Sequence, residues 1–249
     1  MYKFYQKNEL LFSIILIVIY VFGASLLDEL SISIGCQKSL TTAFLFVLST
    51  LLIIWIYKNH LTKKYGLSKP IYPPKRFLFY IPLLLLVMLN LLFGMSSSLS
   101  FIESVFYIIS MLFVGLVEEL IFRGFVFKAM EKDNLKVAII VSSVTFGFGH
   151  IINLFIGGFD NVLSNICQVC YATAVGFLFV IIFIKSKSLW PCILTHSLVN
   201  ATSLFIDEKI YYGWVEVVVS IIIIFIAIAY SLFIIKTIPD QEDIKEISN

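Results

Sequence analysis

Four charged or histidine side chains lie inside strongly apolar stretches of this 249-residue sequence once Glu103 and Glu216, near the predicted ends, are set aside, and a fifth directly follows one such stretch. These five are the groups most able to do chemistry there. They are Glu118, Glu119, Arg123, His150 and His196. Placing a charged side chain in the core of a bilayer costs about 2.5–3.5 kcal/mol on insertion scales, so each such group needs a partner or a function. Two of the chain's three histidines belong to this set.

The spacing of the two acids separates their expected roles. Glu119 precedes Arg123 by four residues, so on a helix the two side chains share a face with the acid on the N-terminal side, which is the favourable orientation for an ion pair. Glu118 points about 100° away from Glu119 because of the helical repeat. We therefore expect Glu119 and Arg123 to form a structural pair and Glu118 to be free for chemistry.

Two further pairs repeat the spacing of four residues. His196 and Asn200 should project together from one helix, and both can donate hydrogen bonds. Phe146 and His150 form the other pair, in which we expect the phenylalanine to be a wall of the site. Three helices would thus direct one acid, two histidines and an amide toward one interior site.

The composition identifies the solvent of these helices. Apolar residues make up 60% of the chain, charged residues only 14%, and the mean hydropathy is +0.99. Soluble domains average about 45–50% apolar and about 25% charged residues, so a soluble enzyme is excluded and the lipid bilayer is the expected environment. The net charge of +2 comes from scattered lysines, which predicts no nucleic-acid partner.

The apolar stretches predict an all-α, polytopic membrane protein. A bilayer core about 30 Å thick requires about 20 apolar residues of helix, and about eight stretches meet or nearly meet this length. They are residues 10–27, 40–57, 77–95, 101–122, 137–156, 163–184, 189–206 and 214–235.

The basic residues orient these spans. With eight spans, all 18 basic residues except Lys38 and Lys209 fall on the side that also holds both termini. Cytoplasmic loops carry such an excess, so we expect a multi-pass protein of the cell membrane with both termini in the cytoplasm. The site should then be a cavity in the helix bundle that opens toward the cytoplasmic side. A composition rich in Ile, Phe, Lys and Asn indicates a bacterial source.

Taken together, the pairs resemble the three motifs of the CPBP family of intramembrane proteases, which includes CAAX proteases and bacteriocin-processing enzymes. The motifs EExxxR, FxxxH and HxxxN occur in this order, each inside a predicted span. The resemblance covers roughly residues 101–206. The residues that carry it are Glu118, Glu119, Arg123, Phe146, His150, His196 and Asn200.

The resemblance implies hydrolysis of peptide bonds inside the membrane. In that family's scheme Glu118 is the general base and shares an attacking water with His150, while His196 and Asn200 form the oxyanion hole. Glu119, Arg123 and Phe146 would support them. The expected substrate is a peptide or protein in the membrane, such as the precursor of a small secreted peptide, with a role in bacteriocin processing or immunity.

The resemblance leaves the cofactor open. Many members of the family are catalogued as metalloproteases, and Glu118, His150 and His196 would be a plausible zinc triad. The HExxH spacing of common zinc proteases is absent, and Asn200 is a poor zinc ligand but a good oxyanion donor. We therefore expect no required cofactor, with zinc as the alternative.

The chain divides by these expectations into four parts. Residues 1–100 hold the first three membrane helices, 101–206 form the protease core with helices four to seven, 207–238 hold the last membrane helix, and 239–249 form a polar cytoplasmic tail.

Two other functions compete with the protease. The same fold without activity would be a membrane scaffold that regulates a partner or gives self-immunity to a bacteriocin, but the complete motif set argues against it. A proton-coupled transporter would use Glu118 and the histidines as a relay, but the sequence has no internal repeat of the kind many transporters show.

Overall fold

The computed structural model describes residues 1–94, 99–152 and 162–239, and over these ranges the regular structure is entirely helical. This confirms the all-α, polytopic class. The helices are α1 (Tyr2–Lys7), α2 (Glu9–Ser33), α3 (Ser39–Lys58), α4 (Ile81–Leu89), α5 (Phe101–Glu119), α6 (Phe127–Met130), α7 (Leu135–Gly149), α9 (Val162–Ser186), α10 (Trp190–Thr202), α11 (Glu208–Tyr211) and α12 (Trp214–Thr237). Shorter turns are η1 (Pro74–Tyr80), η2 (Asn90–Phe93), the π-helical η3 (Leu120–Val126) and η5 (Ser203–Phe205).

Within the described residues, six segments are long and apolar enough to cross a membrane. The expected count of eight is not confirmed, because two of the eight stretches form shorter helices. Helix α7 has 15 residues and α10 has 13, which at 1.5 Å per residue gives about 22 Å and about 20 Å. The predicted polar tail lies outside the described residues from position 240 onward.

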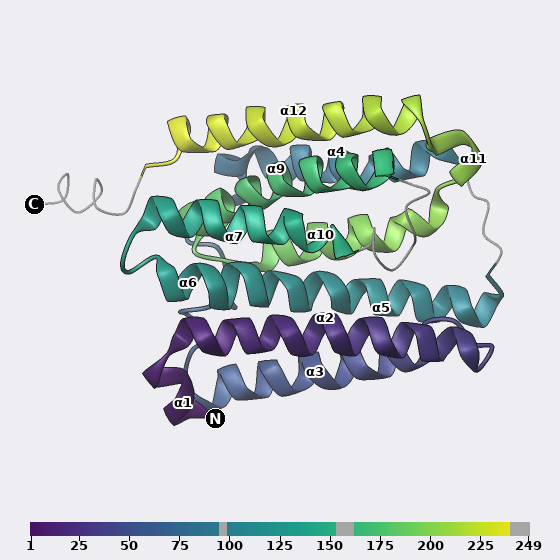
Figure 1. Ribbon diagram of the computed structural model, residues 1–249. Helices are drawn as coiled ribbons and strands as arrows, with labels where there is room; N and C mark the ends of the chain where they lie inside the picture. The colour runs from purple at the N-terminus through teal and green to yellow at the C-terminus, as the bar shows by residue number, and fades with distance from the viewer. Residues whose placement is uncertain (95–98, 153–161, 240–249) are drawn as a thin grey trace, which may run out of the picture.

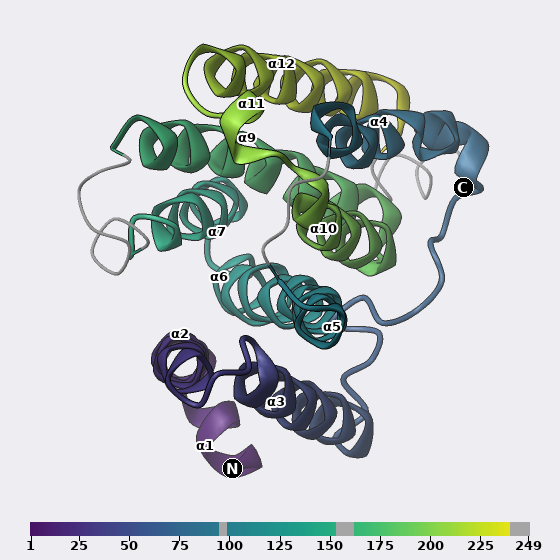
Figure 2. The same cartoon turned by 90° about the vertical axis from the view of Figure 1, so that its right-hand side faces the viewer.

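The helices form a bundle of roughly parallel and antiparallel rods (Figure 1). Seen along their axes, α2 and α3 lie on one side of α5, while α7, α10, α9, α4 and α12 lie on the other (Figure 2). Helix α5 packs mainly on α10 and α3, α7 packs on α9, and α9 packs on α12. Helix α5 is therefore central, and its C-terminal end carries the two acids singled out above.

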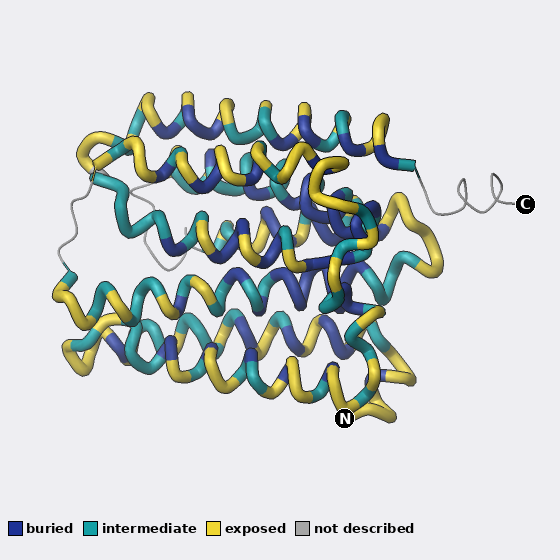
Figure 3. Tube along the Cα trace, turned by 180° about the vertical axis from the view of Figure 1, so that it is seen from behind, coloured by how far each residue is buried: buried dark blue, intermediate teal, exposed yellow. Residues whose placement is uncertain are grey.

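The outside of the bundle is apolar. Buried residues gather on the faces that the helices turn toward one another, and exposed ones follow the outer faces (Figure 3). Phe22 and Phe225 are 70% and 71% exposed, and many other large apolar side chains of α2 and α12 also face outward. Such a surface is stable in lipid and not in water.

Helix α5 approaches α10 closely because it presents a glycine to it. A Cβ added at Gly115 would lie 2.5 Å from both the backbone nitrogen and the hydroxyl oxygen of Ser197. The Ser197 hydroxyl also donates to the carbonyl oxygen of Leu112, at 2.8 Å. A small residue thus allows the two backbones to touch, as in other membrane helix pairs, and this contact places His196 beside the end of α5.

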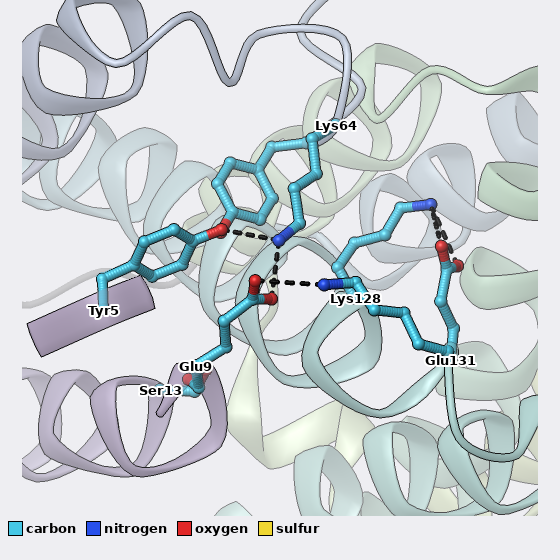
Figure 4. A network of polar contacts seen from close by, with 8 residues as sticks. Tyr5, Glu9, Ser13, Lys64, Lys128 and Glu131 are labelled. Carbon is cyan, nitrogen blue, oxygen red and sulfur yellow. Dashed lines mark hydrogen bonds and ion pairs between the residues drawn. The ribbon is translucent and has the colours of Figure 1, made fainter. Parts of the chain in front are cut away.

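A polar network joins the chain segments at the end of the bundle where α1 lies (Figure 4). The Lys64 ammonium donates to Glu9 and to Tyr5, both at 2.6 Å, and the Tyr65 hydroxyl donates to that of Tyr5 at 2.7 Å. Burial alone would lower the pKa of Lys64, but these two hydrogen bonds outweigh it and hold the pKa above its usual value. The network fixes the start of α2 and, with it, the position of that helix against η3.

We predict that Gly115→Ala lowers the thermal stability of the purified protein in detergent. The added methyl group meets backbone atoms of α10, and overpacking of this kind costs about 1–3 kcal/mol. Gly124→Ala is the matched control, because its Cβ would lie 3.6 Å from the nearest atom of Tyr65, an ordinary contact. Equal melting temperatures for the two variants would show that the close contact of α5 with α10 at Gly115 does not determine the thermal stability.

Candidate active site

A buried cluster of three charged or ionisable groups lies where α5 meets α10. Arg123 Nη1 donates to Glu119 Oε1 at 3.0 Å, and both side chains are 0% exposed. Nδ1 of His196 lies 2.9 Å from the same Glu119 oxygen. The expected pairing of Glu119 with Arg123 is therefore confirmed, and His196 joins it from a second helix.

Aromatic rings enclose the Arg123 guanidinium. Its central carbon lies 4.0 Å from the ring centroid of Phe146 and 5.5 Å from that of Phe179, distances at which a cation is attracted to the ring face. Nε and Nη2 of Arg123 have no hydrogen-bond partner among the described residues. The rings thus provide much of the stabilisation of the buried cation. Phe146 supports the ion pair, a role beyond that of a wall.

The arginine is placed by a local change in helix geometry. Residues Leu120–Val126 form a π-helical stretch, η3, directly after the two acids, and all seven are buried. Ser142 of α7 donates its hydroxyl to the carbonyl oxygen of Phe122 in this stretch, at 2.8 Å. The π-helix satisfies backbone groups differently from an α-helix, and such insertions occur frequently at functional sites.

Glu118 has a different set of contacts from Glu119. The Tyr20 hydroxyl of α2 donates to Glu118 Oε1 at 2.5 Å. Oε2 lies 3.5 Å from Nε2 of His196 and has no hydrogen-bond partner among the described residues. The two acids therefore face the two nitrogens of one imidazole. A protonated His196 ring can donate to both carboxylates, whereas a neutral ring can donate to only one.

Glu118 also borders a cavity of about 150 Å³ between α2, α5 and α7. Its walls are formed by Tyr20, Val21, Ala24, Ser25, Glu118, Phe122, Phe146, Gly149, His150 and Ile152. The acid and His150 thus share one space, with mostly apolar or small side chains around them. The lining residues of α2 lie near the middle of that helix, so the cavity is well inside the bundle. Its opening toward the cytoplasm stays a prediction.

The remaining predicted residues lie less directly at the cavity. His196 and Asn200 are not among the lining residues. The side chain of Asn200 makes no hydrogen bond within the described part of the chain, while its backbone carbonyl accepts one from Ser203 at 2.6 Å. The structure thus brings Glu118, Phe146 and His150 together at the cavity and puts His196 behind Glu118. The oxyanion role of His196 and Asn200 stays a prediction.

Sequence reasoning missed Tyr20. It lies in the first apolar stretch, which matched the motif pattern only as a hydrophobic helix, and it contacts an acid 98 positions away. A polar side chain near the middle of that stretch was the one available signal, because a buried tyrosine hydroxyl usually has a partner.

The described side chains do not form a metal-binding group. No set of three or more His, Cys, Asp or Glu residues in ranges 1–94, 99–152 and 162–239 is arranged to hold a metal ion. Nδ1 of His196 is already directed to Glu119 Oε1, and Glu118 Oε1 accepts the Tyr20 hydroxyl. This arrangement does not fit the zinc triad of Glu118, His150 and His196, and we derive no step through zinc.

Comparison with known proteins finds a similar family for this helical core. Residues 100–202 match the model of the family of Rce1-like type II CAAX prenyl endopeptidases. This range holds all three motifs and the helices α5 to α10. Residues 100–202 are thus similar to a family of membrane proteases, in agreement with the resemblance drawn from the motifs.

A curated relative carries a similar description. Over 94 residues, which are 37% of this chain, the sequence is 31% identical to the "Putative membrane peptidase YdiL" of Bacillus subtilis (strain 168). The matched region spans 33% of the length of that relative. No solved structure matches the chain. The N-terminal helices that supply Tyr20 lie outside the family match, which begins at residue 100.

We predict that Arg123→Met strongly destabilises the protein. Removal of the guanidinium leaves Glu119 as an uncompensated charge in an apolar bundle, which costs about 3–5 kcal/mol for buried pairs. The measurement is thermal unfolding of the purified protein in detergent.

The double variant Glu119→Gln/Arg123→Met is the matched control. It removes both charges and retains similar volumes, so it should recover much of the lost stability. If the double variant is as unstable as Arg123→Met, the loss comes from packing of the arginine on Phe146 and Phe179 and not from the unpaired charge.

Proposed function

We propose that this protein is an intramembrane endopeptidase of the glutamate type. Its substrate class is a small membrane-associated or secreted peptide precursor. The family match of residues 100–202 supports a protease in general. The observation that carries the proposal further is the position of Glu118, whose Oε2 has no hydrogen-bond partner among the described residues and whose side chain borders the cavity shared with His150.

In the proposed reaction Glu118 acts as general base. It takes a proton from a water molecule that His150 also contacts, and the resulting hydroxide attacks the carbonyl carbon of the peptide bond. The bond from carbon to nitrogen then breaks, and the proton passes to the leaving amine. A cavity of about 150 Å³ suffices for water beside part of a substrate, since one water takes about 30 Å³ of liquid volume.

His196 and Asn200 are proposed to stabilise the oxyanion of the tetrahedral intermediate. They lie one helical turn apart on α10, and both carry N–H donors. Donors fixed in advance are most effective where water is scarce, as in this bundle. The contact of His196 with Glu119 and the packing of Ser197 on Gly115 fix that part of α10 in place.

Orientation and biological role are further parts of this proposal. The start of α2 and the ends of α3, α9 and α12 lie at one end of the bundle, which also carries most of the basic residues (Figure 1). By the positive-inside rule that end faces the cytoplasm. We propose a bacterial cell-membrane enzyme that acts in bacteriocin processing or immunity.

We predict that Glu118→Gln abolishes peptide cleavage. Loss of a general base costs about 10²–10⁴-fold in rate, while the amide keeps the volume and the hydrogen bond from Tyr20. The protein is assayed in phospholipid vesicles with a panel of internally quenched apolar peptides, each made with and without a lipid group. In cells, secreted peptides are compared between a deletion strain and a Glu118→Gln strain.

Membrane abundance of Glu118→Gln, measured by immunoblot, should equal that of the wild type. Lys209→Gln is the control substitution, because Lys209 lies in the short α11 away from the cavity. Wild-type cleavage by Glu118→Gln would reject the enzyme and favour the scaffold function.

We further predict that removal of metal leaves activity unchanged. The protein is treated with a chelator until elemental analysis finds no bound zinc, and cleavage of the best peptide is measured. If activity disappears and returns on addition of zinc alone, the metal-free mechanism is wrong.

A further inference from the structure

We propose that Tyr20 is a positioning residue of this active site and that the N-terminal helix α2 is therefore part of it. Its hydroxyl holds the carboxylate of Glu118 at the border of the cavity, where the proposed reacting water would lie. This inference rests on the proposed function, because it concerns how the general base is held.

The contact is short and well enclosed. The Tyr20 hydroxyl lies 2.5 Å from Glu118 Oε1, and the tyrosine is only 8% exposed. It lines the same cavity as Glu118 and His150. Hydrogen bonds to a carboxylate acceptor are among the strong kinds when the carboxylate is ionised, and the burial of the tyrosine keeps bulk water away from the donor.

The carboxylate needs such a contact because little else restrains it. The last torsion of a glutamate side chain is broad and roughly two-fold, so the carboxylate can turn unless a neighbour fixes it. On its other side, Oε2 lies 3.5 Å from Nε2 of His196, beyond a good hydrogen bond. Tyr20 is therefore the main restraint on Glu118 among the described residues.

Packing at the inner end of α2 fixes Tyr20 in turn. The helix lies against η3, the stretch that follows the two acids. The ring of Phe12 lies 5.2 Å from that of Trp55 and 5.6 Å from that of Phe125, between ring centroids. The position of the hydroxyl is thus set by a rigid aromatic cluster two helical turns away, and not by the family-matched segment alone.

Tyr20→Phe tests the inference, since it removes one oxygen atom and keeps the ring. Misplacement of a catalytic group by about 1 Å can cost 10²-fold in rate, so we expect kcat to fall about tenfold to hundredfold. KM should stay within about twofold, because Tyr20 acts through Glu118 in the reaction step and not in binding. The probe is the best-cleaved quenched peptide of the panel above, in phospholipid vesicles.

Tyr230→Phe is the matched control. Tyr230 is also buried, and its hydroxyl donates to the carbonyl oxygen of Phe77 at 2.6 Å, far from the cavity. This variant loses one buried hydrogen bond of similar length but should retain wild-type kcat. An equal fall of kcat in both variants would mean a general loss of structure and would overturn the assigned role.

A double-mutant cycle adds a readout that a structural role would not produce. Glu118→Asp withdraws the carboxylate by one methylene group and breaks the contact with Tyr20. In that background Tyr20→Phe should change the residual kcat by less than about twofold, because coupled residues do not act additively. Full additivity of the two effects would overturn the proposal.

If Tyr20→Phe fails to accumulate in the membrane, two variants with unnatural amino acids test the role of the hydroxyl instead. Replacing Tyr20 by 4-aminophenylalanine keeps a hydrogen-bond donor at the same place, whereas 4-fluorophenylalanine fills a similar volume without a donor. Activity of the amino variant well above that of the fluoro variant supports the role, and equal activity overturns it.

Loss of activity in Glu118→Gln together with wild-type kcat in Tyr20→Phe would reject this inference alone, whereas wild-type activity in both would reject the proposed function.

Discussion

The structure depends on one constraint: a full cation is buried in a bundle whose surroundings are lipid. Arg123 is 0% exposed, and among the described residues its carboxylate partner is Glu119, at 3.0 Å. A lone buried charge would cost several kcal/mol, so partner, rings and helix geometry must all be in place together. The aromatic faces of Phe146 and Phe179 supply the rest of the environment, and they come from α7 and α9. The charge therefore ties together helices that hydrophobic contact alone would not orient.

This constraint also determines where the proposed chemistry would take place. Because Glu119 binds Arg123 and His196, the end of α5 is fixed in rotation and depth, and Glu118 must point away toward α2 and α7. The cavity lies on that side. The close contact at Gly115 keeps α10 near enough for His196 to reach both acids. The site is thus held together by the ion pair of Glu119 with Arg123 and by Gly115, which lets α5 and α10 come close.

Much of this followed from the sequence, and the missing parts have physical reasons. The pairing of Glu119 with Arg123 was predictable because it is local, four residues along one helix. The contact of Tyr20 with Glu118 was not, since it depends on how α2 packs across 98 positions. The count of eight spans was also not confirmed, because hydropathy cannot tell a short helix shielded by its neighbours, such as α10, from one that crosses the lipid. Asn200 was predictable as a neighbour of His196, but its place relative to the cavity depends on tertiary packing.

The two adjacent acids have partners of different kinds: Glu119 contacts the cation of Arg123, and Glu118 contacts the neutral hydroxyl of Tyr20. Glu119 is ion-paired with Arg123 and also contacts His196, both through Oε1, so it serves structure. Glu118 is held by an uncharged hydroxyl, which fixes one oxygen and leaves the other without a hydrogen-bond partner among the described residues. A second cation in place of Tyr20 would orient the carboxylate equally well, but it would favour the ionised form and so make the proposed general base weaker. A neutral donor orients the carboxylate with a smaller loss of basicity, and in this chain that donor comes from α2, outside the helices that carry the motifs.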